Sequence, residues 1–481
     1  MTANTLRTAR TRALTLFAIV MLTGCALSEP MLRPQMDLPA QWDSATAVAD
    51  DSQAALSASW WHSFASPQLD TLIAEAHAQA PELRMQAERV IQAELALRSA
   101  GASLLPSLAL SGSSGAQNRD GSETRSTGLN LAASYELDLW GRLAATRDSA
   151  AAGLQASRFD YDAARLSLSA AVANAWFLQL ALDERTAIAQ RNLDIAERVL
   201  RVVDARYRNG AASALDLSQQ RSTVLAQRAT LETLRLQQRQ AGFALALLRG
   251  RAPQDNPLAD ETLAALQVPD IAPGLPSALL LRRPDLAAGE ASLAAAAANV
   301  AAARAALLPT FSLSAGGGVA SASLFSLADP THTLSLTASV LQTIFDGGRL
   351  AAQADIQRSR QRELVENQRR AILLALKEVE DALSQAERDR RQETMQREIR
   401  AEAERSLRLA ELRYREGADS LLVVLDAQRS LFAAEDQLAQ LRLSRLSAAV
   451  ALYKALGGGW APEYPDEAVG SARGTGDDGE S

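Results

Sequence analysis

The sequence predicts a mostly α-helical chain built from a tandem repeat, with a pair of short amphipathic strands in each half. Three observations support this fold class. Sequence landmarks recur about 200 residues apart, and strand-like alternation of apolar and polar residues occurs in both halves. Proline is absent from 107 to 252 and from 331 to 461. Because proline breaks a helix interior, these two intervals permit very long helices.

The repeat is visible in four landmarks that occur in the same order in each half. RYRNGA at 206–211 returns as RYREGA at 413–418, an offset of 413 − 206 = 207. The other pairs are 81–83 with 284–286 and 104–107 with 307–310, both offset by 203, and 141–145 with 348–352, offset by 207. Solenoid repeats have periods of about 20–50 residues. One duplication of about 200 residues is therefore indicated.

The first 25 residues predict export from the cytoplasm. Three arginines precede an apolar run at 13–22 that is too short to span a bilayer, which is typical of a secretory signal. Leu22-Thr23-Gly24-Cys25 follows, and Cys25 is the only cysteine, so no intrachain disulfide can form. The motif resembles the lipobox of bacterial lipoproteins, which implies a lipidated Cys25. Ala26 at the next position implies sorting to the outer membrane. The alternative is an ordinary signal peptide with a chance cysteine.

Each half begins with a helix and continues into two strands. In the first half we expect a helix over about 68–102, strands over about 107–117 and 129–139, and a polar loop at 118–125. In the second half we expect a helix over about 285–306, strands around 311–314 and 334–337, and a loop at 321–331. The clearest alternation places Leu and Tyr side chains on one face: Leu129, Leu131, Ala133, Tyr135, Leu137 and Leu139.

Long helices follow the strands. From Gly141 to Arg208 a continuous helix would be about 100 Å long at ~1.5 Å per residue. Near the C-terminus, Val424, Leu431 and Leu438 recur every seven residues. A second seven-residue series, made mostly of alanine, lies between them at 427, 434, 441 and 448. This spacing predicts a coiled-coil seam, which Arg445 interrupts.

The repeated hexapeptide marks the position where such a helix must end. Gly210 and Gly417 supply the residue that tolerates a left-handed C-cap. Ser213 or Ser420 can then cap a returning helix. We therefore expect two helical hairpins, one in each half. Taken alone, these residues are only turn signals.

The resulting division of the chain has six parts. They are a signal peptide (1–24), a lipidated, extended N-terminal segment (25–67), the first repeat (68–252), a linker or equatorial region (253–276), the second repeat (277–460) and a C-terminal tail (461–481). Removal of residues 1–24 takes away three arginines and no acids, so the mature net charge is 46 − 56 = −10. This acidic balance does not suggest a broad nucleic-acid surface.

A membrane barrel must be closed, since an open edge leaves backbone groups unpaired in hydrocarbon. Four amphipathic strands are too few to close one. Known closed barrels begin at about eight strands. Three copies of the chain would supply 3 × 4 = 12 strands and six helical hairpins. One chain therefore needs partners to close a barrel.

The chain resembles outer-membrane efflux proteins of the TolC/OprM type, in the NodT-like lipoprotein group, over nearly its whole mature length. The motifs that carry the resemblance are the following: Trp60-Trp61 with 67–70, Leu-Leu-Pro at 104–106, YELDLWGR at 135–142, LRRPDL at 281–286, RYREG at 413–417, LDAQ at 425–428 and YKALGGGW at 453–460. The resemblance implies a homotrimer with a 12-stranded outer-membrane barrel and a periplasmic helical tunnel. It also implies export of drugs or other small molecules, through a periplasmic adaptor and an inner-membrane pump of the RND class.

The resemblance further implies a gate at the periplasmic tip. Asp419 and Asp426 match acidic positions at the constriction, and Tyr414 matches a tyrosine that ties neighbouring hairpins. Carboxylate rings would attract cations and strain the closed state. Asp419 could instead serve only as an N-terminal helix acid, and Asp426 as part of a solvated face. Val423 stands where relatives carry a second acid. Adaptor contacts are expected at the hairpin tips: Asn209, Gly210, Ala211, Ser213, Glu416, Gly417, Ala418 and Ser420.

Other functions fit the sequence less well. The three histidines, His62, His77 and His332, have no metal-ligand spacing, and the glycine triplets at 316–318 and 457–459 lack the lysine of a phosphate-binding loop. We therefore expect neither an enzyme nor a bound cofactor. The alternatives left open are the outer-membrane channel of a type I protein secretion system and a periplasmic coiled-coil protein that is not a channel.

Overall fold

The computed structural model describes residues 32–43, 57–119, 122–254 and 260–460. The chain divides into two compact units. Of the described residues, one unit comprises those within 32–36, 87–159 and 287–371, and the other comprises those within 37–86, 160–286 and 372–460. Cys25, the signal segment and the tail 461–481 lie outside the described residues.

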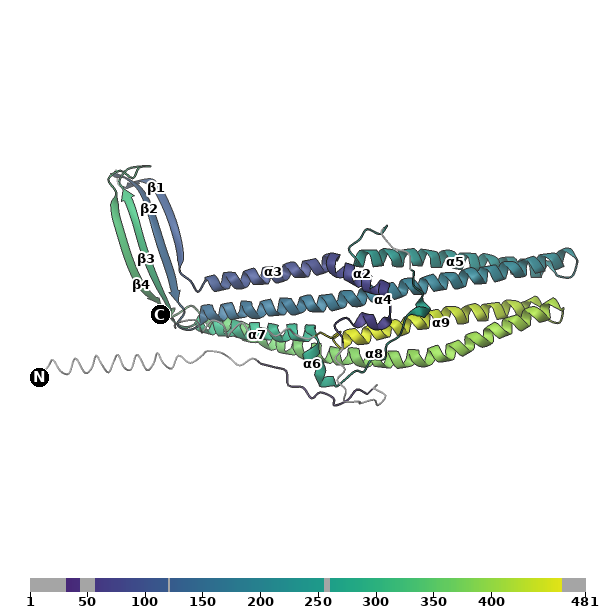
Figure 1. Ribbon diagram of the computed structural model, residues 1–481. Helices are drawn as coiled ribbons and strands as arrows, with labels where there is room; N and C mark the ends of the chain where they lie inside the picture. Colours follow the sequence, from purple (N-terminus) through teal and green to yellow (C-terminus); the bar gives the residue numbers. More distant parts are fainter. Residues whose placement is uncertain (1–31, 44–56, 120–121, 255–259, 461–481) are drawn as a thin grey trace, which may run out of the picture. The chain divides into compact units, whose positions relative to one another are not determined.

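The first unit holds a four-stranded antiparallel sheet in the order β1-β2-β3-β4 (Figure 1). The strands are β1 (Ser107–Arg119), β2 (Ser122–Leu137), β3 (Thr310–Ser321) and β4 (Thr331–Leu341). The central pair, β2 and β3, comes from different halves of the tandem repeat. β1 and β4 are therefore the edge strands, each with one side of its backbone directed away from the sheet.

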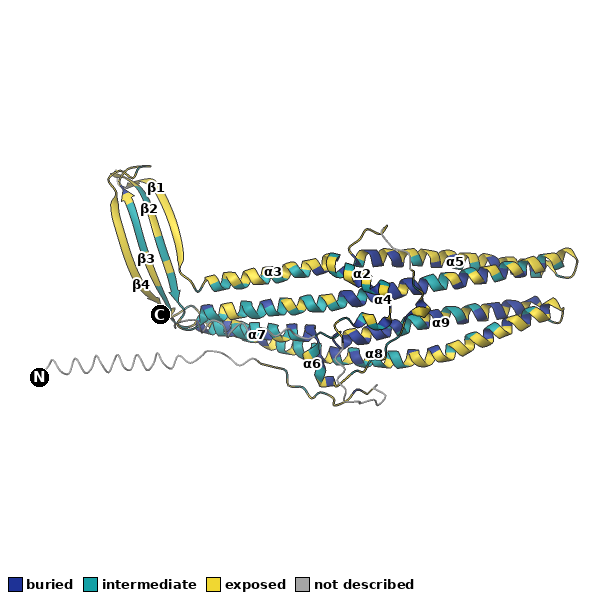
Figure 2. Ribbon diagram, in the orientation of Figure 1, coloured by how far each residue is buried: buried dark blue, intermediate teal, exposed yellow. Residues whose placement is uncertain are grey.

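The register places the apolar alternation of all four strands on one face. Leu110 pairs with Leu131, Leu131 with Gly317, and Gly317 with Leu334. The neighbouring row, on the opposite face, is made of small and polar residues: Ser111, Asn130, Gly318 and Thr333. Leu334 is 91% exposed, so the apolar face is uncovered within a single chain (Figure 2).

The strand pattern was only partly predicted. β2 begins at Ser122 and ends at Leu137, so the expected start at 129 was too late and Leu139 lies beyond the strand. The polar segment 122–125 was expected to be a loop, yet it pairs with β1, where Arg125 lies opposite Ala116. Both strands of this hairpin remain hydrogen-bonded beyond the apolar band, where alternation gives no signal because both faces are polar.

The helices repeat with the same lengths in both halves. α3 (Pro81–Ala102) and α7 (Pro284–Ala305) each have 22 residues. α4 (Arg142–Arg208) and α8 (Arg349–Arg415) each have 67, and α5 (Ala214–Leu248) and α9 (Leu421–Ala455) each have 35. The tandem repeat predicted from the sequence is thus confirmed by the structure.

The single helix expected over 68–102 is two helices. α2 (Pro67–Gln79) ends before Ala80, which has φ −60° and ψ 125°. α3 then begins at Pro81. Proline disfavours helical geometry in the residue before it, which explains the break at Ala80.

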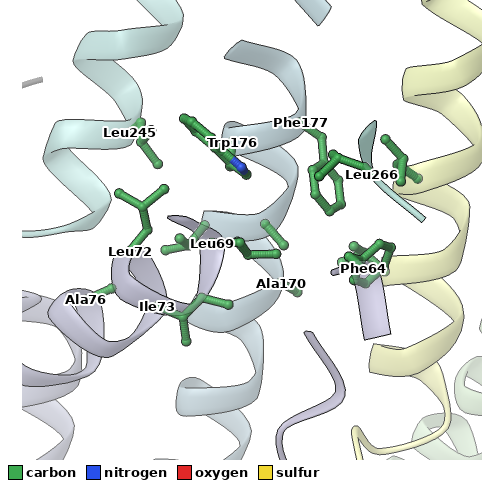
Figure 3. Close-up of a cluster of buried hydrophobic side chains, with 14 of the residues drawn as sticks. Phe64, Leu69, Leu72, Ile73, Ala76, Ala170, Trp176, Phe177, Leu245 and Leu266 are labelled. Atoms are coloured by element: carbon green, nitrogen blue, oxygen red, sulfur yellow. The ribbon is translucent and has the colours of Figure 1, made fainter. Parts of the chain in front are cut away.

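Buried aromatic side chains form the core where the N-terminal segments pack on α4 (Figure 3). Trp176 and Phe177 of α4 are fully buried, and Phe64 lies 5.0 Å from Phe177 between ring centroids. Phe64 belongs to η1 (Trp60–Phe64), a 3-10 helix inside the segment that was expected to be extended. The linker contributes η2 (Leu263–Ala265), and Leu263 is buried in this core.

The two helical hairpins are α4/α5 and α8/α9 (Figure 1). Most of their residues belong to the second unit. Arg185 of α4 bonds Asp436 of α9, with Nε 2.6 Å from Oδ1. Arg445, which interrupts the apolar seam, bonds the buried Glu393 of α8. Burial alone would raise the pKa of the Glu393 carboxyl, but Arg445 and nearby arginines hold this pKa below its usual value. The interruption is therefore an ion pair between helices.

His77 should make the stability of this unit depend on pH. Its Nε2 lies 2.8 Å from Ser169 Oγ, and burial, aided by Arg165, lowers its pKa to about 4. Between about pH 6.5 and 4 the unfolded chain therefore binds a proton that the folded chain does not, so stability falls as pH falls. We expect His77→Gln to lose less apparent melting temperature than the parent between pH 7.5 and 5. An equal loss in both proteins would contradict this role, and His62→Gln serves as control.

Candidate functional site at the hairpin tips

Each long helix ends at its tip in a left-handed glycine. Gly210 has φ +73° and Gly417 has φ +76°. In the first tip, Ala211 N donates to Arg206 O at 2.8 Å, and in the second Ala418 N donates to Arg413 O at 2.8 Å. These six-residue rings are the Schellman arrangement that ends a helix. The two predicted turns are therefore present at the predicted residues.

The returning helices start differently. Ser213 Oγ accepts from Asp216 N at 3.1 Å, and the Asp216 carboxylate accepts from Ser213 N at 2.9 Å, which completes a capping box. Ser420 occupies the matching N-cap position of α9, but its side chain makes no cap bond. The predicted cap is thus present only in the first tip. The residue that corresponds to Asp216 at an offset of 207 is Val423, which cannot complete a capping box.

The second tip uses its acid in another way. Arg413 Nε donates to Asp419 Oδ2 at 2.6 Å, so the carboxylate ties the turn to the end of α8. This hydrogen bond holds the pKa of Asp419 below its usual value. The ion pair is therefore formed at neutral pH, and it is lost only as pH falls below the ordinary value of about 3.9.

One arginine joins the two tips within the chain. Arg206 Nη1 of the first hairpin donates to Tyr414 O of the second at 2.8 Å. The same guanidinium lies over the Tyr414 ring, 4.7 Å from its centroid. Tyr414 is 7% exposed, whereas Tyr207, its counterpart in the first half, is 43% exposed. Burial raises the pKa of the Tyr414 hydroxyl. The near-repeat is therefore asymmetric at this point.

A difference between the two turns accompanies this asymmetry. Arg206 and Arg413 correspond at the offset of 207, but the residue corresponding to Asp419 is Ala212. Arg413 can therefore bond an acid in its own turn, while Arg206 lacks that acid and extends to the other hairpin. Sequence reasoning missed both arginines as functional candidates, although both stand at the start of the repeated hexapeptide.

An apolar cluster beneath the tips unites all four helices of the hairpins. It includes Val203 of α4, Leu217 of α5, Leu407 of α8 and Leu421 of α9. Tyr414 belongs to the same cluster, so its position is fixed by packing as well as by Arg206. Movement of the second tip away from the first would expose part of this cluster.

The other predicted residues lie at the surface of the chain. Asp426 is exposed on α9, between the buried Leu425 and Ala427. The tip residues expected to contact an adaptor are all exposed: Asn209, Gly210, Ala211, Ser213, Glu416, Gly417, Ala418 and Ser420. The site thus brings together Tyr414, Asp419 and two arginines, with an accessible turn around each glycine.

Comparison with known proteins gives a consistent result. The family model described as outer membrane efflux protein matches residues 72–251 and 275–458. The pyoverdine export outer membrane protein OpmQ of Pseudomonas putida is 43% identical, over 92% of this chain and 96% of that protein. The cation efflux system protein CusC of Escherichia coli O6:H1 is 34% identical, over 91% of this chain and 96% of that protein.

Solved structures agree with this result. A crystal structure of CusC superposes with a TM-score of 0.79 at 31% identity, covering 90% of this chain and 100% of that one. The Campylobacter jejuni CmeC outer membrane channel superposes with a TM-score of 0.84 at 24% identity, over 92% and 96% of the two chains, and supports the fold alone.

Proposed function

The chain belongs to the outer membrane efflux protein family, and from this premise we propose that three copies of it form the exit duct of a tripartite efflux pump. In this proposal the sheet crosses the outer membrane and the helical hairpins form the periplasmic part of the duct. A periplasmic adaptor and an inner-membrane pump of the RND class deliver the cargo. Acyl chains on Cys25 add a lipid anchor, since several acyl chains anchor more firmly than one.

The sheet is the observation that carries this proposal. It has an uncovered apolar face, a polar face and two edge strands. In hydrocarbon an unpaired edge is costly, and closure removes it. If β1 of one copy pairs with β4 of the next, three copies form a ring of 3 × 4 = 12 strands. The leucine face then contacts lipid, and the serine-rich face lines the lumen.

The cargo is set by the pump in this account. One relative is named for pyoverdine export and another for cation efflux, yet both align with this chain over more than nine-tenths of its length. A duct that serves such different molecules does not need a dedicated binding site. We therefore propose that this chain passes small molecules that its partners select.

Crosslinking from the tips tests the partner proposal. We expect photocrosslinkers at Asn209 and Glu416 to capture a periplasmic adaptor in intact cells. A probe at the exposed Arg391, along α8, serves as the matched control. Capture from position 391 with none from either tip would contradict the proposed docking site. The purified complex identifies the adaptor, and deletion of the chain should raise cellular accumulation of the compounds its pump exports.

We propose the tip as the gate of the duct. In the closed duct the Arg206 bond and the Asp419–Arg413 pair hold the second hairpin in place. Opening requires the second tip to separate from the first. Three copies of Asp419 and Asp426 would place acidic groups around a narrow opening, which favours cations.

Asp419→Ala should leak ions because Arg413 loses the acid that fixes the turn. We expect more current through the reconstituted protein at equal protein load, together with a lower preference for cations in a salt gradient. Asp426→Ala is the matched control for the current alone: it also removes an acidic group at the opening and should lower cation preference, but it leaves the turn intact, so its current should stay at the level of the parent. Current and reversal potential equal to those of the parent would reject a gating role for Asp419.

A further inference from the structure

The loop between β3 and β4 is held by a row of hydroxyl groups on the leucine face of the sheet. Ser114 pairs with Thr127, and Thr127 pairs with Ser321, so these residues lie side by side across three strands. Alternate residues of a strand lie on the same face. Ser114 therefore shares the face of Leu110, Thr127 that of Leu131, and Ser321 that of Val319, so all three hydroxyl groups lie on the apolar face. They follow directly after the last leucine row.

Four bonds join this row to the backbone of loop 322–330. Ser321 Oγ donates to Ala328 O at 2.6 Å, and it accepts from Ser323 N at 3.3 Å. Thr127 Oγ1 donates to Ser323 O at 2.7 Å. Phe325 N donates to Ser114 Oγ at 3.1 Å. The loop, which starts at β3, therefore crosses β2 and reaches β1 on the leucine side.

The bound loop presents apolar side chains outward. Phe325 is 82% exposed, and Leu324 and Leu327 are 37% and 42% exposed. Phe325 also has φ +54°, a left-handed conformation that is unfavourable for a bulky residue. The hydrogen bond from Phe325 N to Ser114 fixes the loop at this residue while its ring stays uncovered.

The position of the loop matches the edge of the lipid-facing band. From Leu129 to Leu137 the apolar face of β2 spans nine residues, close to the 9–11 residues of a tilted transmembrane strand. Membrane barrels carry aromatic residues at both edges of this band. The helix end of the sheet has Tyr135, Phe311 and Trp140. Among the described residues at the loop end, Phe325 is the only aromatic.

We propose that loop 322–330 lies on the lipid side of the barrel and that Leu324, Phe325 and Leu327 insert among the acyl chains of the outer leaflet. The inference rests on the proposed assembly, in which the leucine face contacts lipid. Under this proposal the loop lies at the membrane interface and does not cover the lumen. The reason is that every bond from the hydroxyl row to the loop is made on the leucine face, opposite the serine-rich face.

Nitroxide labels on the full-length trimer in lipid vesicles test the proposal. The variants are Phe325→Cys, Leu334→Cys on the leucine face and Ser113→Cys on the serine-rich face; the unsubstituted protein supplies the background from Cys25. We measure collision rates with oxygen, which concentrates in lipid, and with a water-soluble nickel chelate. The ratio of oxygen to nickel collisions at 325 should approach that at 334 and exceed that at 113 severalfold.

The outcomes separate the inference from its premise. A nickel-accessible label at 325 beside an oxygen-accessible label at 334 overturns the loop placement and leaves the assembly standing. Nickel access at 334 overturns the assignment of the leucine face to lipid, and the loop placement with it. Adding Thr127→Val to Phe325→Cys should raise label mobility and nickel access; an unchanged signal would show that the hydroxyl row does not hold the loop.

Discussion

Cells that carry Arg206→Ala should become several-fold more sensitive to a large hydrophilic antibiotic that an intact outer membrane excludes. The substitution removes the bond to Tyr414 O and the contact of the guanidinium with the Tyr414 ring. A hydrogen bond to a charged group contributes about 1.5–3 kcal/mol, and a partly buried cation–π contact adds about 0.5–2 kcal/mol. Every 1.4 kcal/mol changes a closed-to-open ratio about tenfold, and a trimer loses the contact three times.

Arg208→Ala is the matched control for this prediction. Arg208 lies on the same tip, and its side chain bonds Asp204 within α4. It should leave sensitivity at the level of the parent. The minimum inhibitory concentration is measured at equal amounts of folded trimer in the outer membrane. Equal sensitivity of Arg206→Ala and the parent would mean that the contact between the tips does not keep the duct closed.

Gly457→Ala should strongly destabilise the second unit. Gly457 has φ +90°, and a Cβ there would lie 1.9 Å from Arg282 O. Forcing an atom into such a site costs at least about 1–3 kcal/mol, and the left-handed backbone adds about 1–2 kcal/mol. We expect a large drop in apparent melting temperature and in the yield of trimer.

Gly417→Ala is the control that separates the steric clash of a new Cβ from the energetic cost of a left-handed backbone. Gly417 also has a left-handed φ, +76°, but a Cβ there meets no atom within 4 Å. It should therefore lower the melting temperature by the backbone cost alone, and so by less than Gly457→Ala does. Gly250, the first-half counterpart of Gly457, would place a Cβ 2.5 Å from Gln79 O and should behave like Gly457. Similar melting temperatures for Gly417→Ala and Gly457→Ala would show that close contact at the end of α9 is not required.

The repeat made most of the helical fold predictable. Offsets of 203 and 207 in the landmarks correspond to pairs of helices of equal length, because duplicated sequences carry the same start and stop signals. Gly210 and Gly417 were predicted correctly for a local reason, the left-handed C-cap. The break at Ala80 also has a local cause, Pro81, and could have been predicted.

The strand ends and the tip contacts were not predictable in the same way. Arg125 continues β2 because its backbone pairs with β1, and pairing between strands leaves no trace in a polar segment. Arg206 reaches Tyr414 in the other hairpin, 208 residues away in the sequence, and its own turn carries alanine at position 212 instead of an acid. The sequence shows Arg206 and Tyr414, but only the structure shows that they are in contact.

Single-channel current through the purified trimer in a planar bilayer tests the central claim most directly. The parent should give small, discrete current steps, since its tip is closed, and Arg206→Ala should give larger steps of the same ion preference. No steps from either protein, when both are folded, trimeric and inserted in the membrane, would contradict the account of a duct that is closed at its hairpin tips.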